Sequence, residues 1–110
     1  AAMGGHLYVG TFNLKGYQVW RTTADGTAPY TWEKVIDQGA FRGPLNQCVL
    51  SMHPFKEALY IGSGIQGGGV DRQNKGGPAA PELIRIFPDG QWDLIVGESR
   101  QTPQGLKKPI

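Results

Sequence analysis

The stretch LYVGT at residues 7–11 returns as LYIGS at residues 59–63, 52 residues further along the chain. A second pattern, a tryptophan followed by an acid and then by apolar residues, occurs as WEKVI at residues 32–36 and as WDLIV at residues 92–96. The order of the matches is the same in both copies, so only the connections differ in length. A repeat of about 50 residues built from short apolar runs is typical of stacked β-units, above all of propeller blades.

Seven short runs rich in β-branched and aromatic residues predict strands, because each is bounded by Gly, Pro, Asn or Asp. The predicted strands are residues 6–12, 17–22, 32–37, 47–52, 58–63, 82–87 and 92–97. Asp89 and Gly90 predict a tight turn between the last two strands, since Asp bonds its own backbone and Gly accepts a positive φ. No segment has convincing helical periodicity, and the sequence therefore predicts an all-β chain.

The strand count predicts about two four-stranded antiparallel, propeller-like blades of the up-and-down kind. A blade has four strands ordered outward from the central channel. Residues 47–97 supply all four, with a long insertion at residues 64–80, whereas residues 1–46 supply only the last three and a connector. Residues 98–110 form a basic tail or connector.

Repeat units cannot bury their faces alone, and about three or more are normally needed for stability. We therefore expect the chain to be part of a larger or oligomeric propeller, with other copies of the chain or the remaining blades as partners. Otherwise its outer faces would remain as large apolar patches. Trp32 and Trp92 share their sequence context, so we expect both to be buried at equivalent blade positions.

The first copy carries a longer motif: LYVGT, then GYQVWRT at residues 16–22, Asp-Gly at residues 25–26, Trp32 and Val35. This series resembles the blade repeat of bacterial β-propeller proteins, LYVGT–n–G-x-E-V-W-R-T–n–DG–n–W-x-x-V. The second copy follows the pattern only at its strand-forming positions and has LIR at residues 83–85 in place of Val-Trp-Arg. The resemblance implies an incomplete propeller and little about activity.

Composition excludes several function classes. The 110 residues carry a formal net charge of +2 without a basic face, so we expect no nucleic-acid partner. No apolar run approaches a membrane span, and we expect no membrane partner. Cys48 is the one cysteine, which excludes an internal disulfide and a cysteine metal cluster, and it is predicted to be a small core residue. His6 and His53 lack metal-ligand spacing, so no metal site is expected.

The GxGxxG pattern at residues 62–67, with Glu82 20 residues beyond its first glycine, imitates a dinucleotide fingerprint. A loop rather than a helix follows it, however, and the helix N-terminus that would hold the pyrophosphate is missing. No cofactor is therefore expected.

The insertion at residues 64–80 is the most distinctive segment, because residues 12–16 make the matching connection in the first copy. Long loops in compact domains are functional or disordered. In an up-and-down sheet this loop shares one end with residues 38–46 and with the segment after residue 97. The predicted ligand or partner contacts on that rim are Arg42, Asp71, Arg72, Gln73, Asn74 and Lys75.

These observations favour a non-enzymatic scaffold or recognition module of β-propeller type, with a carbohydrate or a protein as ligand. No catalytic residues are predicted, since no Ser-His-Asp set, Cys-His pair or close carboxylate pair is present. Two alternatives stay open: a fragment of a propeller hydrolase whose catalytic residues lie outside this chain, and a lectin-like carbohydrate binder with an exposed Trp or Tyr. Localisation is not determined, and an extracellular or cell-surface place in bacteria is the preferred expectation.

Overall fold

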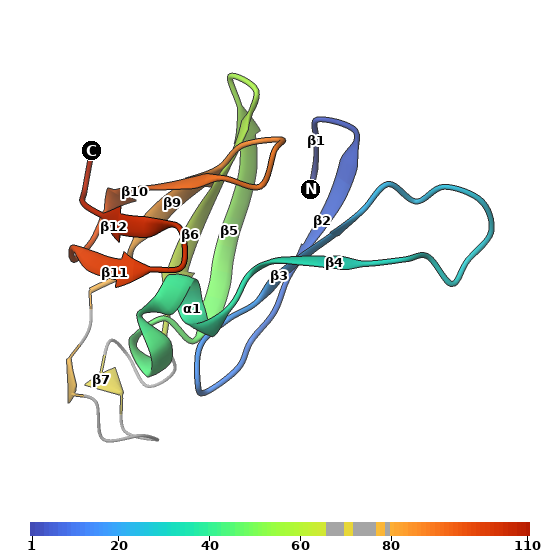
Figure 1. Ribbon diagram of the computed structural model, residues 1–110. Coiled ribbons are helices and arrows are strands. Elements are labelled where there is room, and N and C mark those ends of the chain that lie inside the picture. The colour runs from blue at the N-terminus through green and yellow to red at the C-terminus, as the bar shows by residue number, and fades with distance from the viewer. Residues whose placement is uncertain (66–69, 72–76, 79) are drawn as a thin grey trace.

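Two four-stranded antiparallel sheets dominate the computed structural model, which describes residues 1–65, 70–71, 77–78 and 80–110 (Figure 1). The first sheet has the order β1-β2-β3-β4, with the bounds Ala2–Met3, His6–Gly10, Val19–Thr22 and Glu33–Ile36. The second has the order β10-β9-β6-β5, formed by β5 (Cys48–Phe55), β6 (Ala58–Gly64), β9 (Leu83–Ile86) and β10 (Trp92–Val96). The predicted all-β class with four-stranded antiparallel sheets is confirmed.

Each of the seven predicted runs overlaps one of these strands, although β5 and β6 extend past their predicted ends, and two further features were not predicted. The expectation that residues 1–46 supply only three strands was wrong, because the two-residue strand β1 pairs with β2. A hairpin of β11 (Arg100–Thr102) and β12 (Gly105–Lys107) lies in the segment expected to be a tail or connector. Such short or polar strands lack the apolar run that marks a strand in a sequence.

Four small elements complete the described part of the chain. The connection between the sheets contains α1 (Gln38–Phe41), capped by the Asp37 side chain, and the 3-10 turn η1 (Gly43–Leu45). Two two-residue strands, β7 (Val70–Asp71) and β8 (Gly77–Pro78), pair with each other.

A set of three cross-strand neighbours, a tyrosine, an arginine and an acid, occurs in both sheets. In the first sheet Tyr8 pairs with Arg21 and Arg21 with Glu33. The Arg21 side chain donates to the Tyr8 hydroxyl at 3.2 Å and to Glu33 at 2.6 Å. We call the sheet face that carries these residues the Tyr-Arg-acid face.

The second sheet has the same arrangement in Tyr60, Arg85 and Asp93, which pair in the same register. Arg85 donates to the Tyr60 hydroxyl at 3.4 Å and to Asp93 at 2.9 Å. Side chains alternate between the faces of a strand, so the residues flanking each triad lie on the opposite face. We call that opposite face of each sheet the apolar face.

The apolar face of the second sheet is buried. Its six residues flanking the triad are at most 2 % exposed, namely Leu59, Ile61, Ile84, Ile86, Trp92 and Leu94. They form one hydrophobic cluster with Met3, Tyr8, Val19 and Ile36 of the first sheet. The Tyr-Arg-acid face of the first sheet therefore packs against the apolar face of the second sheet.

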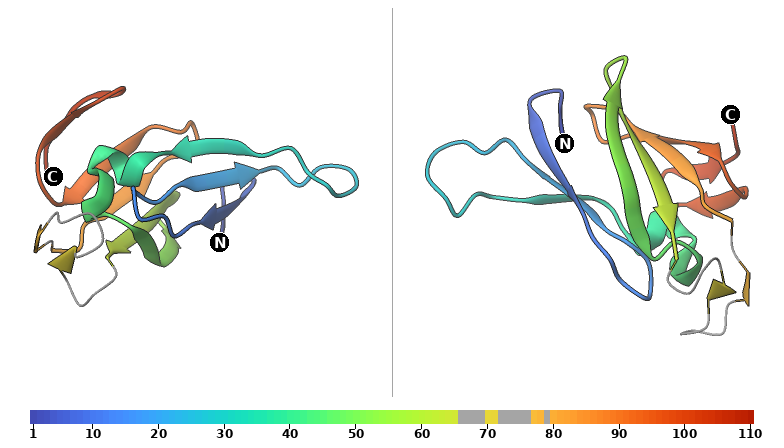
Figure 2. Two further views of the ribbon diagram at one scale, coloured as in Figure 1. Left: turned by 90° about the horizontal axis from the view of Figure 1, so that it is seen from below. Right: turned by 180° about the vertical axis from the view of Figure 1, so that it is seen from behind.

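Two contacts mark where the sheets meet. A Cβ added to Gly10 of β2 would lie 2.7 Å from the Val49 side chain of β5, so the strands approach closely there. Arg21 also donates to the Pro88 carbonyl at 2.8 Å, in the turn between β9 and β10. The connection between β3 and β4, in contrast, projects away from both sheets (Figures 1 and 2).

The apolar face of the first sheet is uncovered. Leu7 is 42 % exposed, Val9 44 % and Trp32 38 %, so the prediction of a buried Trp32 was wrong, while Trp92 is buried as predicted. The two tryptophans differ because other parts of the chain cover only Trp92. Trp92 faces the first sheet and lies beneath the Lys107 amine, 4.8 Å from its ring centroid, whereas Trp32 lies on the face turned away from the second sheet.

Candidate functional site

Arg42 joins three irregular segments at one end of the second sheet. It follows α1, and one of its terminal nitrogens donates to the Ala80 carbonyl at 2.8 Å, just before β9. The other terminal nitrogen donates to Glu98 at 2.6 Å, just after β10. The expected rim, on which the connections between strands meet, is therefore present among the described residues.

Glu82 is the buried centre of this rim, with a side chain that is 1 % exposed. Its Oε1 accepts from Asn46 at 2.8 Å and from Arg100. Its Oε2 accepts from the Glu98 backbone at 2.8 Å and lies 3.4 Å from Arg42 Nε. Three hydrogen bonds and an ion pair with Arg42 therefore hold the carboxylate.

Asn46 connects Glu82 to β6 and α1. Its side-chain oxygen accepts from Ser63 at 2.8 Å, and the same Ser63 oxygen accepts from the Glu82 backbone N–H at 2.9 Å. Its amide nitrogen also donates to the Gly39 carbonyl at 3.0 Å. We call the residues joined in this way the rim network: Arg42, Asn46, Ser63, Glu82, Glu98 and Arg100.

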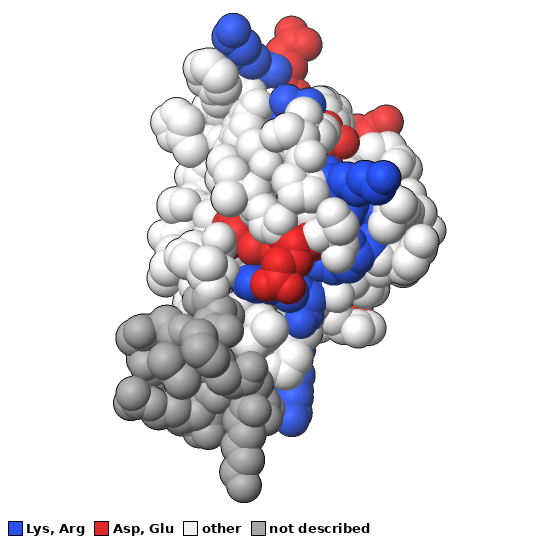
Figure 3. Space-filling view, turned by 90° about the vertical axis from the view of Figure 1, so that its left-hand side faces the viewer, with Lys and Arg blue, Asp and Glu red and all other residues white. Residues whose placement is uncertain are grey.

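The charges of the rim network balance, with two arginines and two glutamates. Figure 3 shows acidic and basic side chains next to one another on the side of the molecule that carries β10, β11 and β12. The hydrogen bond and charge of Arg42 lower the pKa of Glu98. Burial raises the pKa of the nearby Tyr17 hydroxyl, the Glu82 carboxylate raises it further, and Arg100 acts in the opposite direction. A network of this kind holds loops in fixed positions.

Of the predicted contact residues, the structure places Arg42 inside the rim network, with a side chain that is 6 % exposed. Arg72, Gln73, Asn74 and Lys75 lie outside the described residues, and of Asp71 only the backbone in β7 is described. Arg42 therefore acts first as a structural anchor, because its donors are directed at protein acceptors.

Sequence reasoning missed Asn46, Glu82, Glu98 and Arg100 as a group. A signal was available, because polar residues stand at the ends of strands that alternate in direction. Asn46 precedes β5, Ser63 lies near the end of β6, Glu82 precedes β9 and Glu98 follows β10. In an up-and-down sheet these four positions lie at the same end.

The second candidate surface is the apolar face of the first sheet. Val9, Trp20 and Trp32 line an open cavity of about 370 Å³ on this face. The Lys34 amine lies 5.6 Å from the Trp20 ring centroid at its border. A cavity lined by apolar and aromatic side chains is the usual form of a binding surface.

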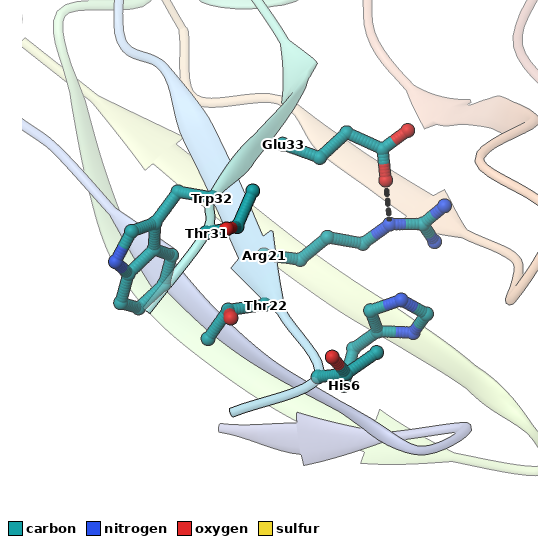
Figure 4. Close-up of a pocket in the computed structure, with 7 residues that line it drawn as sticks. His6, Arg21, Thr22, Thr31, Trp32 and Glu33 are labelled. Atoms are coloured by element: carbon teal, nitrogen blue, oxygen red, sulfur yellow. Dashed lines mark hydrogen bonds and ion pairs between the residues drawn. The ribbon is translucent and has the colours of Figure 1, made fainter. Parts of the chain in front are cut away.

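A smaller, more polar pocket of about 190 Å³ adjoins it at Trp32, with a lining of His6, Arg21, Thr22, Thr23, Thr31, Trp32 and Glu33. Figure 4 shows Arg21 and Glu33 paired on one side of the strands, with the Trp32 ring pointing to the other side. The smaller pocket is thus lined by residues from both faces of the first sheet.

Cys48 is half-buried rather than fully buried, and its thiol donates to the Gly64 carbonyl at 3.3 Å. Burial raises its pKa.

Within residues 1–65 and the other described segments, no three His, Cys, Asp or Glu side chains are grouped as around a metal ion. None of the helices in the described part is long and apolar enough to cross a membrane.

Comparison with protein-family models, with curated proteins and with solved structures produced no match for this chain. The proposals below rest on its own sequence and geometry.

Proposed function

We propose that this chain is a non-enzymatic scaffold or recognition module of β-propeller type, in which four-stranded sheets stack face to face and the rim at one end meets the ligand. One observation carries the proposal. The same cross-strand set of a tyrosine, an arginine and an acid is found in both sheets in the same register, as Tyr8, Arg21 and Glu33 in the first and as Tyr60, Arg85 and Asp93 in the second. This match supports an origin of both sheets from one repeated unit, as the sequence repeat at residues 7–11 and 59–63 does.

The stacking order also supports a propeller-type arrangement. Each sheet has two distinct faces, and here the Tyr-Arg-acid face of one sheet lies on the apolar face of the next. Such a packing uses a different face of each sheet, so it can continue with further sheets in the same direction. The stacked sheets of a propeller follow one another around a channel in this way.

The rim network supports recognition rather than catalysis. The Glu82 carboxylate is occupied by donors from Asn46, Arg100 and the Glu98 backbone, so it orders the loops instead of taking a proton from a substrate. Loops held by a buried network present their outer side chains in fixed positions, which lowers the entropic cost of binding. A protein or a carbohydrate is the proposed ligand class.

The test is a binding screen of the labelled chain on glycan and peptide arrays, with a variant that lacks residues 67–78. We expect the variant to fold, because the first sheet joins the matching strands β2 and β3 through a short connection, and we expect it to lose binding. Lys56→Asn, in the turn between β5 and β6 at the other end of the sheet, is the matched control and should bind like the parent.

Two results would contradict the proposal. The first is array binding that survives the deletion unchanged. The second is hydrolysis of chromogenic glycosides or esters by the purified chain, which would contradict a non-enzymatic role.

The exposure of Trp32 keeps the lectin-like carbohydrate binder as a second candidate, because exposed tryptophans stack on sugar rings. The walls of the larger cavity, however, are Val9, Trp20 and Trp32, and a sugar site also needs polar groups that fix the hydroxyls. Titration of the tryptophan fluorescence with cello- and chito-oligosaccharides tests whether the cavity at Trp32 binds carbohydrate. A saturable change that disappears in Trp32→Ala would favour the carbohydrate binder.

A further inference from the structure

The apolar face of the first sheet is the counterpart of a face that is buried in the second sheet. Leu7 and Val9 flank Tyr8 as Leu59 and Ile61 flank Tyr60. Leu7 and Val9 are 42 % and 44 % exposed, whereas Leu59 and Ile61 are both 0 % exposed. The same kind of surface is thus covered in one sheet and open in the other.

The Tyr-Arg-acid face shows the reverse pattern. The Arg21 side chain, which faces the second sheet, is 9 % exposed, and its counterpart Arg85 is 30 % exposed. Tyr8 is 1 % exposed, while Tyr60 is only half-buried. The two stacked sheets therefore have two outer faces. One is the uncovered apolar face of the first sheet, and the other is the partly uncovered Tyr-Arg-acid face of the second sheet.

These two free faces are of the two kinds that already pack together inside the molecule. The internal contact joins Tyr8 and its neighbours to the apolar face of the second sheet in one hydrophobic cluster, and Arg21 donates to the Pro88 carbonyl at its edge. A second copy of the chain offers the same Tyr-Arg-acid surface through Tyr60, Arg85 and Asp93. The lining of Val9, Trp20 and Trp32 favours a protein surface that carries such groups over a small polar ligand.

We propose that a second copy of this chain covers the apolar face of the first sheet with the Tyr-Arg-acid face of its own second sheet, so that copies stack head to tail. The proposal rests on the face-to-face stacking in the proposed function. Arg85 then makes on the other copy the kind of contact that Arg21 makes with Pro88, at the connection between β3 and β4, since Asp25 and Gly26 match Asp89 and Gly90. An interface of two different surfaces extends to a ring or an open stack.

The experiment is sedimentation equilibrium of the full chain and of variants that block one face each. Trp32→Glu places a charge on the apolar face of the first sheet, and Arg85→Glu reverses the charge on the Tyr-Arg-acid face of the second sheet. We expect the parent chain to self-associate and each variant alone to bind itself roughly tenfold or more weakly. An equal mixture should form a one-to-one heterodimer and stop there, because Arg85→Glu keeps an intact apolar face and Trp32→Glu keeps an intact Tyr-Arg-acid face.

Two further variants make the result specific. Leu106→Glu changes an apolar side chain that is 51 % exposed on β12, away from both faces, and should associate like the parent. His53→Glu, at an exposed position that pairs with Tyr60, replaces Arg85→Glu if that variant does not fold by circular dichroism.

Two outcomes overturn the proposal. One is a parent chain that stays monomeric at the highest soluble concentration, which would assign the apolar face to another sheet or another protein. The other is that the Arg85→Glu and His53→Glu variants still dimerise while the Trp32→Glu variant stays monomeric. This result would indicate that two apolar faces pair with each other. Neither outcome affects the proposed function, whose failure is detected separately, by array binding that survives the deletion or by hydrolytic activity.

Discussion

Trp32 and Trp92 each stand directly before the acid that pairs with the arginine of their sheet, yet Trp32 is 38 % exposed and Trp92 is 2 % exposed. The local sequences share a tryptophan followed by an acid, so the difference in exposure comes from what lies opposite each ring. Trp92 belongs to the hydrophobic cluster between the sheets, and Lys107 of the β11–β12 hairpin covers its ring. Trp32 faces away from the second sheet.

Trp92→Ala is expected to lower the free energy of unfolding by about 3–5 kcal/mol, because a large buried side chain is lost and a cavity remains. Trp32→Ala should change it by only about 0.5 kcal/mol in the monomer, as is usual for an exposed position. Urea unfolding followed by far-UV circular dichroism, at dilution where the chain is monomeric, measures both. Equal losses in the two variants would show that the open face is covered in the monomer.

Glu82→Gln is expected to destabilise the fold by about 3–5 kcal/mol, because it leaves the Arg42 and Arg100 guanidinium groups without the buried carboxylate they share. Glu98→Gln is the matched control within the same network. Its carboxylate is 70 % exposed, so its loss should cost at most about 1 kcal/mol. Thermal and urea unfolding at pH 7 compare the two, and a larger loss for Glu98→Gln would show that the network is not centred on Glu82.

Gly10→Ala is expected to destabilise the protein by about 1–3 kcal/mol, as overpacking in a core does, because the new Cβ would lie 2.7 Å from Val49 of the facing sheet. Gly62→Ala is its counterpart in the second sheet. There the Cβ would meet the Ser51 hydroxyl, which can rotate away. Stability measured on the two single variants, on Val49→Gly and on Gly10→Ala with Val49→Gly tests the contact. Gly10→Ala should cost less when residue 49 is glycine, because the Val49 Cβ, one of the atoms 2.7 Å from the new Cβ, is then gone.

The stability of the fold should decrease on the acid side. The pKa of Glu98 is lower in the folded chain than its ordinary value, first through the hydrogen bond from Arg42, and that of Asp37 is lowered first by Lys34. A carboxyl with a lowered folded pKa contributes stability that is present above the unfolded pKa of about 4 and is lost as the pH falls through the folded pKa. The side chain of Glu98 is 70 % exposed and that of Asp37 is 32 % exposed, so water screens both ion pairs and each contributes at most about 1 kcal/mol.

Unfolding free energies measured from pH 7 to pH 3 in Glu98→Gln should therefore fall less steeply than in the parent and converge with it at the acid end. Glu57→Gln, in the turn between β5 and β6, is the control and should follow the parent curve. A Glu98→Gln curve that runs parallel to the parent throughout would contradict the pairing with Arg42.

The strand positions were open to prediction because each depends on a local pattern. The apolar runs at residues 58–63 and 82–87, rich in β-branched and aromatic residues and bounded by Gly, Pro or Asp, indicate strands whatever surrounds them. The strand β1 and the β11–β12 hairpin were not open to prediction in this way. They pair through a few backbone bonds, and only the presence of β2 and of Trp92 makes those positions favourable.

The rim network was predicted only through Arg42. Glu82 bonds to Asn46, 36 residues before it, and to Arg100, 18 residues after it. A single polar residue at a strand end does not show which partner it meets.

The sequence by itself determined the all-β class and the seven main strands, since β-forming runs and turn chemistry act over a few residues. Only the tertiary structure decided which face of each sheet is covered, which tryptophan is buried and which charges meet at the rim. Both faces of a strand can be apolar, as around Tyr8 and Tyr60, and burial then depends on how the two sheets stack. That stacking is set by contacts between distant segments, such as Gly10 with Val49 and Arg21 with Pro88, which leave no local pattern in the chain.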